Sequence, residues 1–138
     1  MKLTDRELLE KIVKQDIGHM AGVLASDPDC PDWIRDYVVN NGTKDSKLSF
    51  IRSGHATPDE LRVLSQVKSW RILGAVLLSP NCPAELLAKY ADTGKKNVRM
   101  TVACNTSCPD EILMKLAQDL DPVVKINVVR NPSVRRRF

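Results

Sequence analysis

Apolar residues fall in short clusters separated by polar turns, and two kinds of cluster alternate along the chain. In the first kind, adjacent apolar pairs recur one helical turn apart, as in Leu86, Leu87, Tyr90 and Ala91. That spacing is typical of one face of an α-helix. Clusters of the second kind, such as Val98, Val102 and Ala103, are richer in β-branched residues and span about two turns. Since such a short helix is marginal alone, packing between neighbours must hold it.

A start signal precedes each cluster of the first kind: a small residue, a proline in four of five cases, then an acid. The steps between first residues are 26, 27, 25 and 26, for the starts Thr4, Cys30, Thr57, Cys82 and Cys108. A period of this length indicates stacked units that supply each other's core. We therefore expect one domain over 1–138, with repeats near 4–29, 30–56, 57–81, 82–107 and 108–133 and a basic tail at 134–138.

The start signals also predict how the first helix of each unit is capped. With Cys82 as N-cap, Pro83 lies at N1 and Glu85 at N3, where a carboxylate favours the positive end of the helix dipole. Thr4 with Glu7, and Thr57 with Glu60, have the spacing of a capping box. The third unit has polar residues at some expected apolar places, so its first helix is expected to be rotated or shortened. Turn-forming residues, such as Asn105-Thr106-Ser107, end each unit.

The repeat resembles a known family. Cys-Pro-x-Glu-Leu-Leu, an Ala-Asp or Gln-Asp step, Val-Arg or Val-Lys, Val-Ala and Asn-x-x-x-Pro follow in order, most clearly in Asn81 to Pro109 and again in Ser107 to Pro132. This pattern is similar to the leucine-rich repeat variant. The resemblance implies an all-α, right-handed superhelical solenoid of about five helical hairpins, each an α-helix followed by a shorter α- or 3₁₀-helix, related in shape to armadillo and HEAT arrays. It also implies a binding scaffold, by analogy at the level of fold.

Composition places the chain close to an average globular protein. It has 138 residues, of which 43% are hydrophobic and 28% charged. The longest apolar run, Ile72 to Leu78, is far shorter than the roughly 20 residues that span a bilayer. The N-terminus lacks the apolar region of a signal peptide. We expect a cytoplasmic protein that does not enter a membrane.

Four cysteines raise the question of a metal centre or a disulfide. Cys30, Cys82 and Cys108 occupy one register of the repeat, so adjacent copies should lie about 10 Å apart. A disulfide needs Cα atoms within roughly 7 Å, and metal ligands must converge on one ion at about 2.3 Å from each sulfur. We therefore expect small, half-buried thiols and no metal or cofactor. A redox pair of Cys104 and Cys108 is the alternative. One known member of the family holds an iron–sulfur cluster in a separate cysteine-rich N-terminal segment, and we expect none here because the first repeat begins at Thr4.

Catalytic patterns are not found in the sequence. The two histidines, His19 and His55, precede a second helix and occupy a turn, and neither belongs to a triad or metalloprotease pattern. Repeated acids near helix starts, such as Asp110-Glu111, are explained by capping. We expect no enzymatic activity.

The distribution of charge along the chain is the sequence feature that says most about function. The chain through Glu60 has 8 Lys and Arg against 11 Asp and Glu, giving −3, and the remainder has 13 against 6, giving +7. Much of this excess lies in or beside second helices, with Arg99 and Lys125 in one register. If they line a concave surface, they form a groove that attracts phosphate or acidic peptides. The candidate binding residues are Arg71, Lys95, Lys96, Arg99, Lys125, Arg130, Arg135, Arg136 and Arg137.

Several interpretations of this surface remain open. The basic residues form either a solvated face or the docking surface of a macromolecule, and a protein partner is favoured over nucleic acid because the six aromatic residues offer no evident stacking platform. Trp70 is either an exposed anchor or a filler of the irregular third repeat. HEAT-like DNA glycosylases show that a basic array can perform base excision, but the catalytic Asp and aromatic cradle of those enzymes have no counterpart here.

The last repeat raises the question of homodimerisation. Val124, Val128 and Val129 belong to it, and only Ser133 to Phe138 follow. Stacked arrays require polar end units. An uncovered end would therefore dimerise, unless Phe138 and the arginine stems fold back over it.

Overall fold

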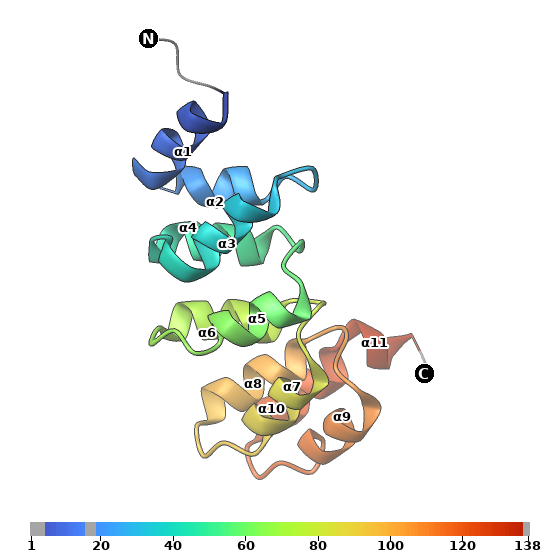
Figure 1. Cartoon of the computed structure of the whole chain (residues 1–138). Coiled ribbons are helices and arrows are strands. Elements are labelled where there is room, and N and C mark those ends of the chain that lie inside the picture. Colours follow the sequence, from blue (N-terminus) through green and yellow to red (C-terminus); the bar gives the residue numbers. More distant parts are fainter. Residues whose placement is uncertain (1–4, 16–18, 137–138) are drawn as a thin grey trace.

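The structure is a computed structural model that describes residues 5–15 and 19–136. Within these ranges the chain forms eleven α-helices and no β-strand, so the expected all-α class is confirmed. The helices follow one another in pairs from the N-terminus to the C-terminus (Figure 1). Their bounds are α1 Asp5–Gln15, α2 Met20–Ala25, α3 Asp32–Asn41, α4 Lys44–Arg52, α5 Pro58–Leu64, α6 Trp70–Leu78, α7 Ala84–Ala91, α8 Lys96–Cys104, α9 Asp110–Leu116, α10 Pro122–Arg130 and α11 Pro132–Arg135.

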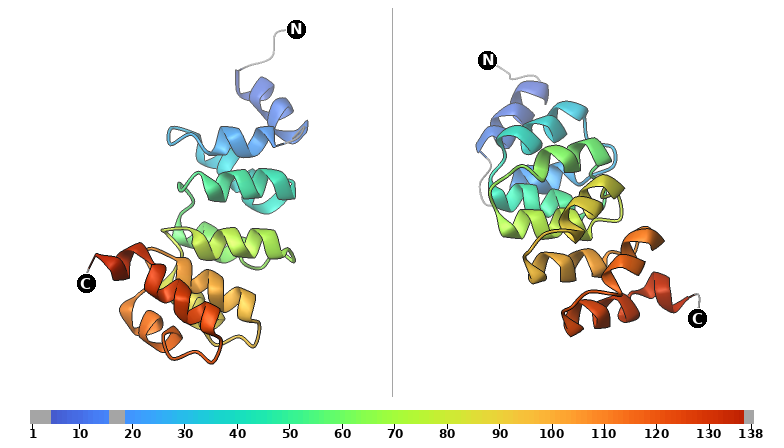
Figure 2. Two further views of the ribbon diagram at one scale, coloured as in Figure 1. Left: turned by 180° about the vertical axis from the view of Figure 1, so that it is seen from behind. Right: turned by 90° about the horizontal axis from the view of Figure 1, so that it is seen from below.

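The even-numbered helices form one row, in which α2 packs on α4, α4 on α6, α6 on α8 and α8 on α10. Each odd-numbered helix from α1 to α9 packs against the even-numbered helix that follows it, and α3 also contacts α5 and α7 contacts α9. Seen from behind, the even-numbered row runs along one side of the molecule (Figure 2). The buried core therefore lies among the even-numbered helices and between them and the odd-numbered helices that pack on them.

Two positions of the even-numbered helices recur every 26 residues and are buried. At the first position Ser46 lies against Gly22 of the preceding helix, and Val98 lines a hollow between α6 and α8 together with Leu77 from the second position. All members of both sets are less than a tenth exposed: Ser46, Ile72, Val98 and Val124 in the first, and Ala25, Ile51, Leu77 and Ala103 in the second. The three helices α4, α6 and α8 therefore have a buried residue at both positions.

The lengths of the helices differ from the expectation of a short second helix. The second helices α6, α8 and α10 have 9 residues each. The first helices of the same pairs are shorter, with 7 residues in α5, 8 in α7 and 7 in α9. Only the α1 and α2 pair shows a marked difference in the expected direction, with 11 and 6 residues. In the last three pairs the even-numbered helix is thus the longer one, whereas α4 has 9 residues against 10 in α3. As expected, α5 is short, but α9 matches it.

Helix starts follow the predicted capping only in part. Thr57 caps α5 with the predicted capping box, in which its hydroxyl accepts from Glu60 N. In the three Cys-Pro segments, however, the proline is the N-cap, with ψ of 143° at Pro31, 140° at Pro83 and 148° at Pro109. The expected N-cap role of Cys30, Cys82 and Cys108 is wrong, because the thiol is a weak acceptor and each helix begins one residue later. Thr4 lies outside the described residues.

Asparagine side chains tie consecutive even-numbered helices together at their C-terminal ends. The Asn105 amide donates to the carbonyls of Leu77 at 2.6 Å and Ser79 at 2.9 Å, and Asn131 donates to those of Ala103 and Asn105, both at 2.8 Å. Both asparagines are 1% exposed. These residues were predicted as turn formers, but their amides also satisfy backbone carbonyls left over at the end of the preceding helix.

None of the described helices is long and apolar enough to cross a membrane.

Candidate functional site

A trough lies on the surface around Trp70, the first residue of α6. Its side chain is exposed, with 62% of the residue accessible. Two hollows, of about 520 and 430 Å³, lie on the two sides of α6, and Trp70 and Gly74 line both. Apolar side chains from α6 form the floor, with Leu73 and Leu77 on one side and Leu78 on the other. We call this surface the Trp70 trough.

Gly74 lines both hollows and places no side chain between them. A Cβ added at Gly74 would meet no atom within 4 Å. Gly22, which occupies the same register two units earlier, lies instead against the backbone of Ser46, and an added Cβ would lie 2.6 Å from Ser46 Cα. The glycine of α6 is therefore not explained by close helix packing.

Cations surround the trough. The Lys95 ammonium lies 3.7 Å from the centre of the Trp70 ring, a cation–π contact that fixes the indole. Lys96 lines the same hollow and reaches Asp121 at 3.8 Å. Arg71 and Arg52 line the hollow on the other side of α6. Neither arginine has an ion-pair partner among the described residues.

The positions of these cations run against the helix dipole. The first turns of α6 and α8 contain no acid, whereas α3, α5, α7 and α9 all begin with Asp or Glu in the first turn. Arg71 and Lys96 lie instead at the positive ends of α6 and α8, where a cation is unfavourable. The first turns of α2 and α10, which do not line the trough, also contain no acid. An anionic ligand would be attracted by both the side chains and the helix ends.

Arg99 does not belong to this surface. Its guanidinium donates from Nε and Nη2 to the two carboxylate oxygens of Asp119 at 2.8 and 3.2 Å, and from Nη1 to the Thr93 carbonyl at 2.9 Å. Only 18% of the Arg99 side chain is exposed. This ion pair lowers the pKa of Asp119. Arg99 therefore joins α8 to the loop before α10, a use that spacing within the repeat did not reveal.

The other predicted basic residues lie away from the trough. Lys125 and Arg130 are exposed on α10, and Arg135 and Arg136 are exposed at and after the end of α11. None of the four lines either hollow. Arg137 lies outside the described residues.

The sequence did not point to Gly74 and Arg52, which line the trough, or to Lys68, which lies beside it. Gly74 sits inside an apolar helix, and such a glycine is itself a signal for a packing or binding reason. Arg52 and Lys68 precede Trp70 in the chain. Lys68 lines a third hollow that also contains Trp70, together with Tyr90 from α7. Only the packing of α4, α6 and α7 brings these residues to one place.

The four cysteine thiols are not activated for nucleophilic chemistry. All four are free thiols, and burial raises the pKa of Cys82 to about 12 and that of Cys108 to about 11. Burial also raises the pKa of Cys30 and Cys104. Since the thiolate is the reactive form, these thiols are poor nucleophiles at neutral pH. Among the described residues, no group of three or more His, Cys, Asp or Glu side chains is placed to hold a metal ion.

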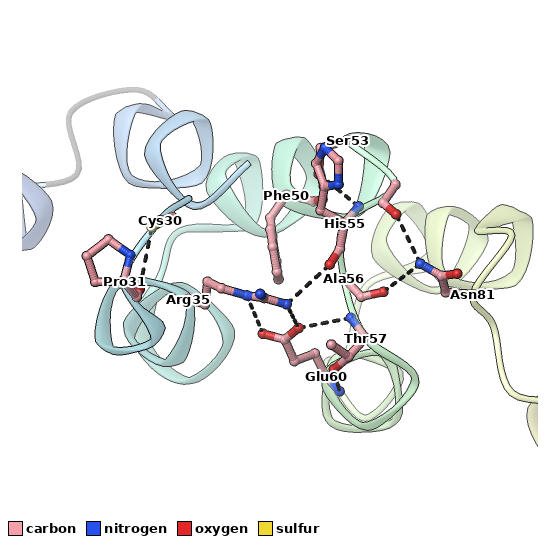
Figure 3. A network of polar contacts seen from close by, with 11 residues as sticks. Cys30, Pro31, Arg35, Phe50, Ser53, His55, Ala56, Thr57, Glu60 and Asn81 are labelled. Atoms are coloured by element: carbon pink, nitrogen blue, oxygen red, sulfur yellow. Dashed lines mark hydrogen bonds and ion pairs between the residues drawn. The ribbon is translucent and has the colours of Figure 1, made fainter. Parts of the chain in front are cut away.

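The turn containing His55 is a structural network (Figure 3). Arg35 donates from Nη2 to the His55 carbonyl at 3.2 Å and from Nε to Glu60 at 3.3 Å, while Glu60 accepts from Thr57 N at 2.9 Å. Asn81 donates to the carbonyls of Gly54 and Ala56 at 3.0 and 3.1 Å. The acids at helix starts thus join neighbouring units as well as capping helices. Arg62 repeats the pattern by pairing with Glu85.

The last even-numbered helix has an uncovered face. Val129 of α10 is 67% exposed, although its equivalents Ala25, Ile51, Leu77 and Ala103 are all buried. Val124 and Val128, by contrast, are buried, and Val134 of α11 packs against the core. Phe138, the expected cover, lies outside the described residues.

Comparison with known proteins gives no relative: no protein-family model matches this chain, and neither curated proteins nor solved structures yielded a match.

Proposed function

We propose that this protein is a non-catalytic interaction scaffold that binds another protein through the Trp70 trough. Its fold in this proposal is a right-handed superhelical solenoid of five helical hairpins, similar to the leucine-rich repeat variant and to armadillo and HEAT arrays. The 26-residue recurrence of buried positions and the asparagine bridges between consecutive helices support that arrangement. Extended surfaces of such arrays are suited to holding a partner.

One observation carries the binding proposal: an exposed tryptophan stands in an apolar trough whose rim is cationic. Large aromatic residues and arginine are enriched at interfaces, and residues of this kind often supply most of the binding energy. The apolar floor favours a partner side chain over a phosphate chain. A protein segment that offers both apolar and acidic groups satisfies the whole surface.

Nucleic-acid binding is the alternative. The cations Arg71, Lys95 and Lys96 would serve phosphates equally well. Among the described residues, Trp70 is the only aromatic one that lines the two hollows of the trough, and Lys95 covers one face of its indole. A stacking platform needs successive free aromatic faces, so the site fits unpaired bases less well. A DNA glycosylase is less consistent still, because no described Asp or Glu lines either hollow of the Trp70 trough.

Affinity capture followed by a salt series tests the proposal. The wild-type chain and the Trp70→Ala variant are immobilised, and bound macromolecules are identified by mass spectrometry and by nuclease digestion. We expect a defined protein partner whose binding survives moderate salt and is lost in Trp70→Ala, because an apolar anchor is not screened. An affinity that falls linearly with the logarithm of salt, for a nuclease-sensitive partner, would favour the phosphate alternative.

We also propose that copies of this chain associate end to end. Met20 of α2 is 43% exposed, although its equivalents Ser46, Ile72, Val98 and Val124 are buried. Val129 is the corresponding bare position at the other end of the row. Elsewhere in the row, the position equivalent to Val129 is buried where the next even-numbered helix packs. The Met20 face of α2 from a second copy can pack on Val129 in the same way. The chain through Glu60 has a net charge of −3 and the remainder has a net charge of +7. The N-terminal end of one copy therefore attracts the C-terminal end of another.

Light scattering of two variants tests this second proposal. Val129→Glu and Met20→Glu should each reduce self-association, since each places a charge in the contact. A mixture of the two variants retains one intact pair of faces and should therefore form dimers. If the wild-type chain is monomeric at all concentrations, the end-to-end proposal is wrong.

A further inference from the structure

We propose that the partner's contact segment is acidic and inserts one apolar side chain into the Trp70 trough, at the place that Gly74 leaves open. This inference rests on the proposed function and specifies the partner's chemistry. It follows from the position of Gly74 in the repeat, from the packing around it and from the charges on both sides.

The register of the repeat shows which side chain Gly74 replaces. The equivalent residues of α4, α8 and α10 are Leu48, Met100 and Ile126, all large and apolar. Leu48 is buried, and Met100 packs against the core. In α6 the same place is open, and it is bordered by Trp70, Leu73 and Leu77. The opening is therefore bordered by apolar side chains, and its volume of about 520 Å³ exceeds that of any single side chain. Ile126, the equivalent residue of α10, is 44% exposed, so the comparison rests on Leu48 and Met100.

No close contact within the described part of the fold requires this glycine. Glycine is costly inside a helix because it leaves the unfolded chain more freedom. At Gly22 that cost is offset by the close approach of the Ser46 backbone, but no atom approaches the equivalent point at Gly74. A ligand group from another molecule is the remaining occupant that the surroundings favour.

Charges on both sides specify the flanks of the inserted residue. Lys95 and Lys96 line the hollow between α6 and α8, and Arg71 and Arg52 line the hollow on the other side of α6. A chain that places its apolar side chain at Gly74 must extend over one or both groups of cations. Carboxylates before and after the apolar residue would satisfy them. The site therefore fits a short acidic segment with a central Leu, Met or Phe.

A peptide series measures this preference directly. The probes are fluorescent peptides of Asp and Glu whose central residue is Leu, Met, Phe, Ala or Gly, and binding to the full chain is followed by anisotropy. We expect the Leu, Met and Phe peptides to bind at least about tenfold more tightly than the Gly peptide. The Gly peptide reports the contribution of charge alone.

The decisive variant is Gly74→Met, which restores the side chain that α8 carries at this register. It should abolish the preference for an apolar centre while leaving the affinity of the Gly peptide unchanged. Because a Cβ at position 74 meets no atom within 4 Å and a hollow of about 520 Å³ adjoins it, the variant should unfold at the same or a higher temperature than the wild type. Gly94→Ala, at a loop glycine that also faces open space, is the matched control and should leave both affinities unchanged.

The outcomes separate this inference from the proposed function. Equal binding of all acidic peptides, unaffected by Gly74→Met, overturns the inserted side chain but keeps an acidic protein partner. Failure of every peptide, with tight binding of a single-stranded DNA or RNA oligonucleotide, overturns both. Failure of peptides and oligonucleotides alike also contradicts both proposals.

Discussion

The α2–α4 contact and the α6–α8 contact use the same register of the repeat in opposite ways. Both contacts have a glycine on the earlier helix, Gly22 in one and Gly74 in the other. At Gly22 the helices approach until the glycine lies against the Ser46 backbone. At Gly74 they leave a hollow of about 520 Å³. Gly22 therefore permits close contact between two helices, whereas Gly74 leaves a hollow that another molecule can occupy.

The residue that faces the glycine is one source of this difference. The residue that faces Gly22 is Ser46, a small buried residue of α4. Its equivalent in α8 is the larger Val98, which lines the hollow. A small residue opposite a glycine lets two helix backbones approach, and a branched one holds them apart. The spacing of stacked helices is thus set in part by the side chains that face each other.

The bridges at the helix ends also differ between the two contacts. In the α6–α8 pair, the Asn105 amide reaches the end of α6. The residue at the corresponding place in α4, 52 positions earlier in the sequence, is Ser53. Its hydroxyl donates to the Phe50 carbonyl of its own helix at 2.6 Å. The end of α4 is therefore joined to α2 without the amide bridge that α6 and α8 share.

Replacing Gly22 with alanine should have the largest effect on stability. The added Cβ would collide with the Ser46 backbone, which cannot rotate away as a side chain can. We expect Gly22→Ala to lower the free energy of unfolding by at least about 3 kcal/mol, at or beyond the upper end of overpacking costs. Urea denaturation followed by circular dichroism measures it. A loss below that of Gly94→Ala would show that the contact is not close in solution.

Removing the bridge at Asn105 should have the next largest effect. Asn105→Ala takes away two hydrogen bonds and leaves the buried carbonyls of Leu77 and Ser79 without their donor. We expect a loss of about 2 to 3 kcal/mol in the same denaturation assay. Asn81→Ala is the control, since Asn81 makes the same kind of bonds in an exposed position and should cost less. Equal losses for the two variants would contradict the importance of burial.

The ion pair between Arg99 and Asp119 should contribute less, and its contribution should depend on pH. The folded-state pKa of Asp119 is lowered, chiefly by its hydrogen bond from Arg99. Its stabilisation is therefore present above the unfolded pKa of about 3.9 and is lost as the pH falls through the lower folded value. We expect Asp119→Asn to be less stable than wild type at neutral pH, by less than Asn105→Ala, with the difference vanishing in strong acid. A difference that is constant with pH would contradict this.

The smallest effect on stability, and the only gain, is expected at Gly74. Gly74→Ala adds a methyl group to open space inside a helix, which should raise the free energy of unfolding by about 0.5 to 1 kcal/mol. Together with Gly22→Ala, it measures the contrast between the two contacts in one assay. Destabilisation by Gly74→Ala would mean that α6 and α8 approach more closely than the structure shows.

The sequence predicted much of the fold but less of the candidate site. The helical class and the Thr57 capping box followed from local patterns that need only a few neighbouring residues. Trp70, Arg71, Lys95 and Lys96 were chosen from charge and position, and packing brings these four around one trough. Arg99 was chosen on the same grounds, although its guanidinium is bound by Asp119. Composition could not distinguish a guanidinium directed at a neighbouring loop from one directed at solvent.

By itself, the order of residues determined the alternation of helices and the 26-residue recurrence of buried positions, because capping and hydrophobic periodicity act over a few turns. Only the tertiary structure decided which of two equivalent glycines is packed and which is open. That choice depends on the facing side chains, Ser46 or Val98, and these come from a different helix. Distances between helices are collective properties of packing, so no single segment encodes them.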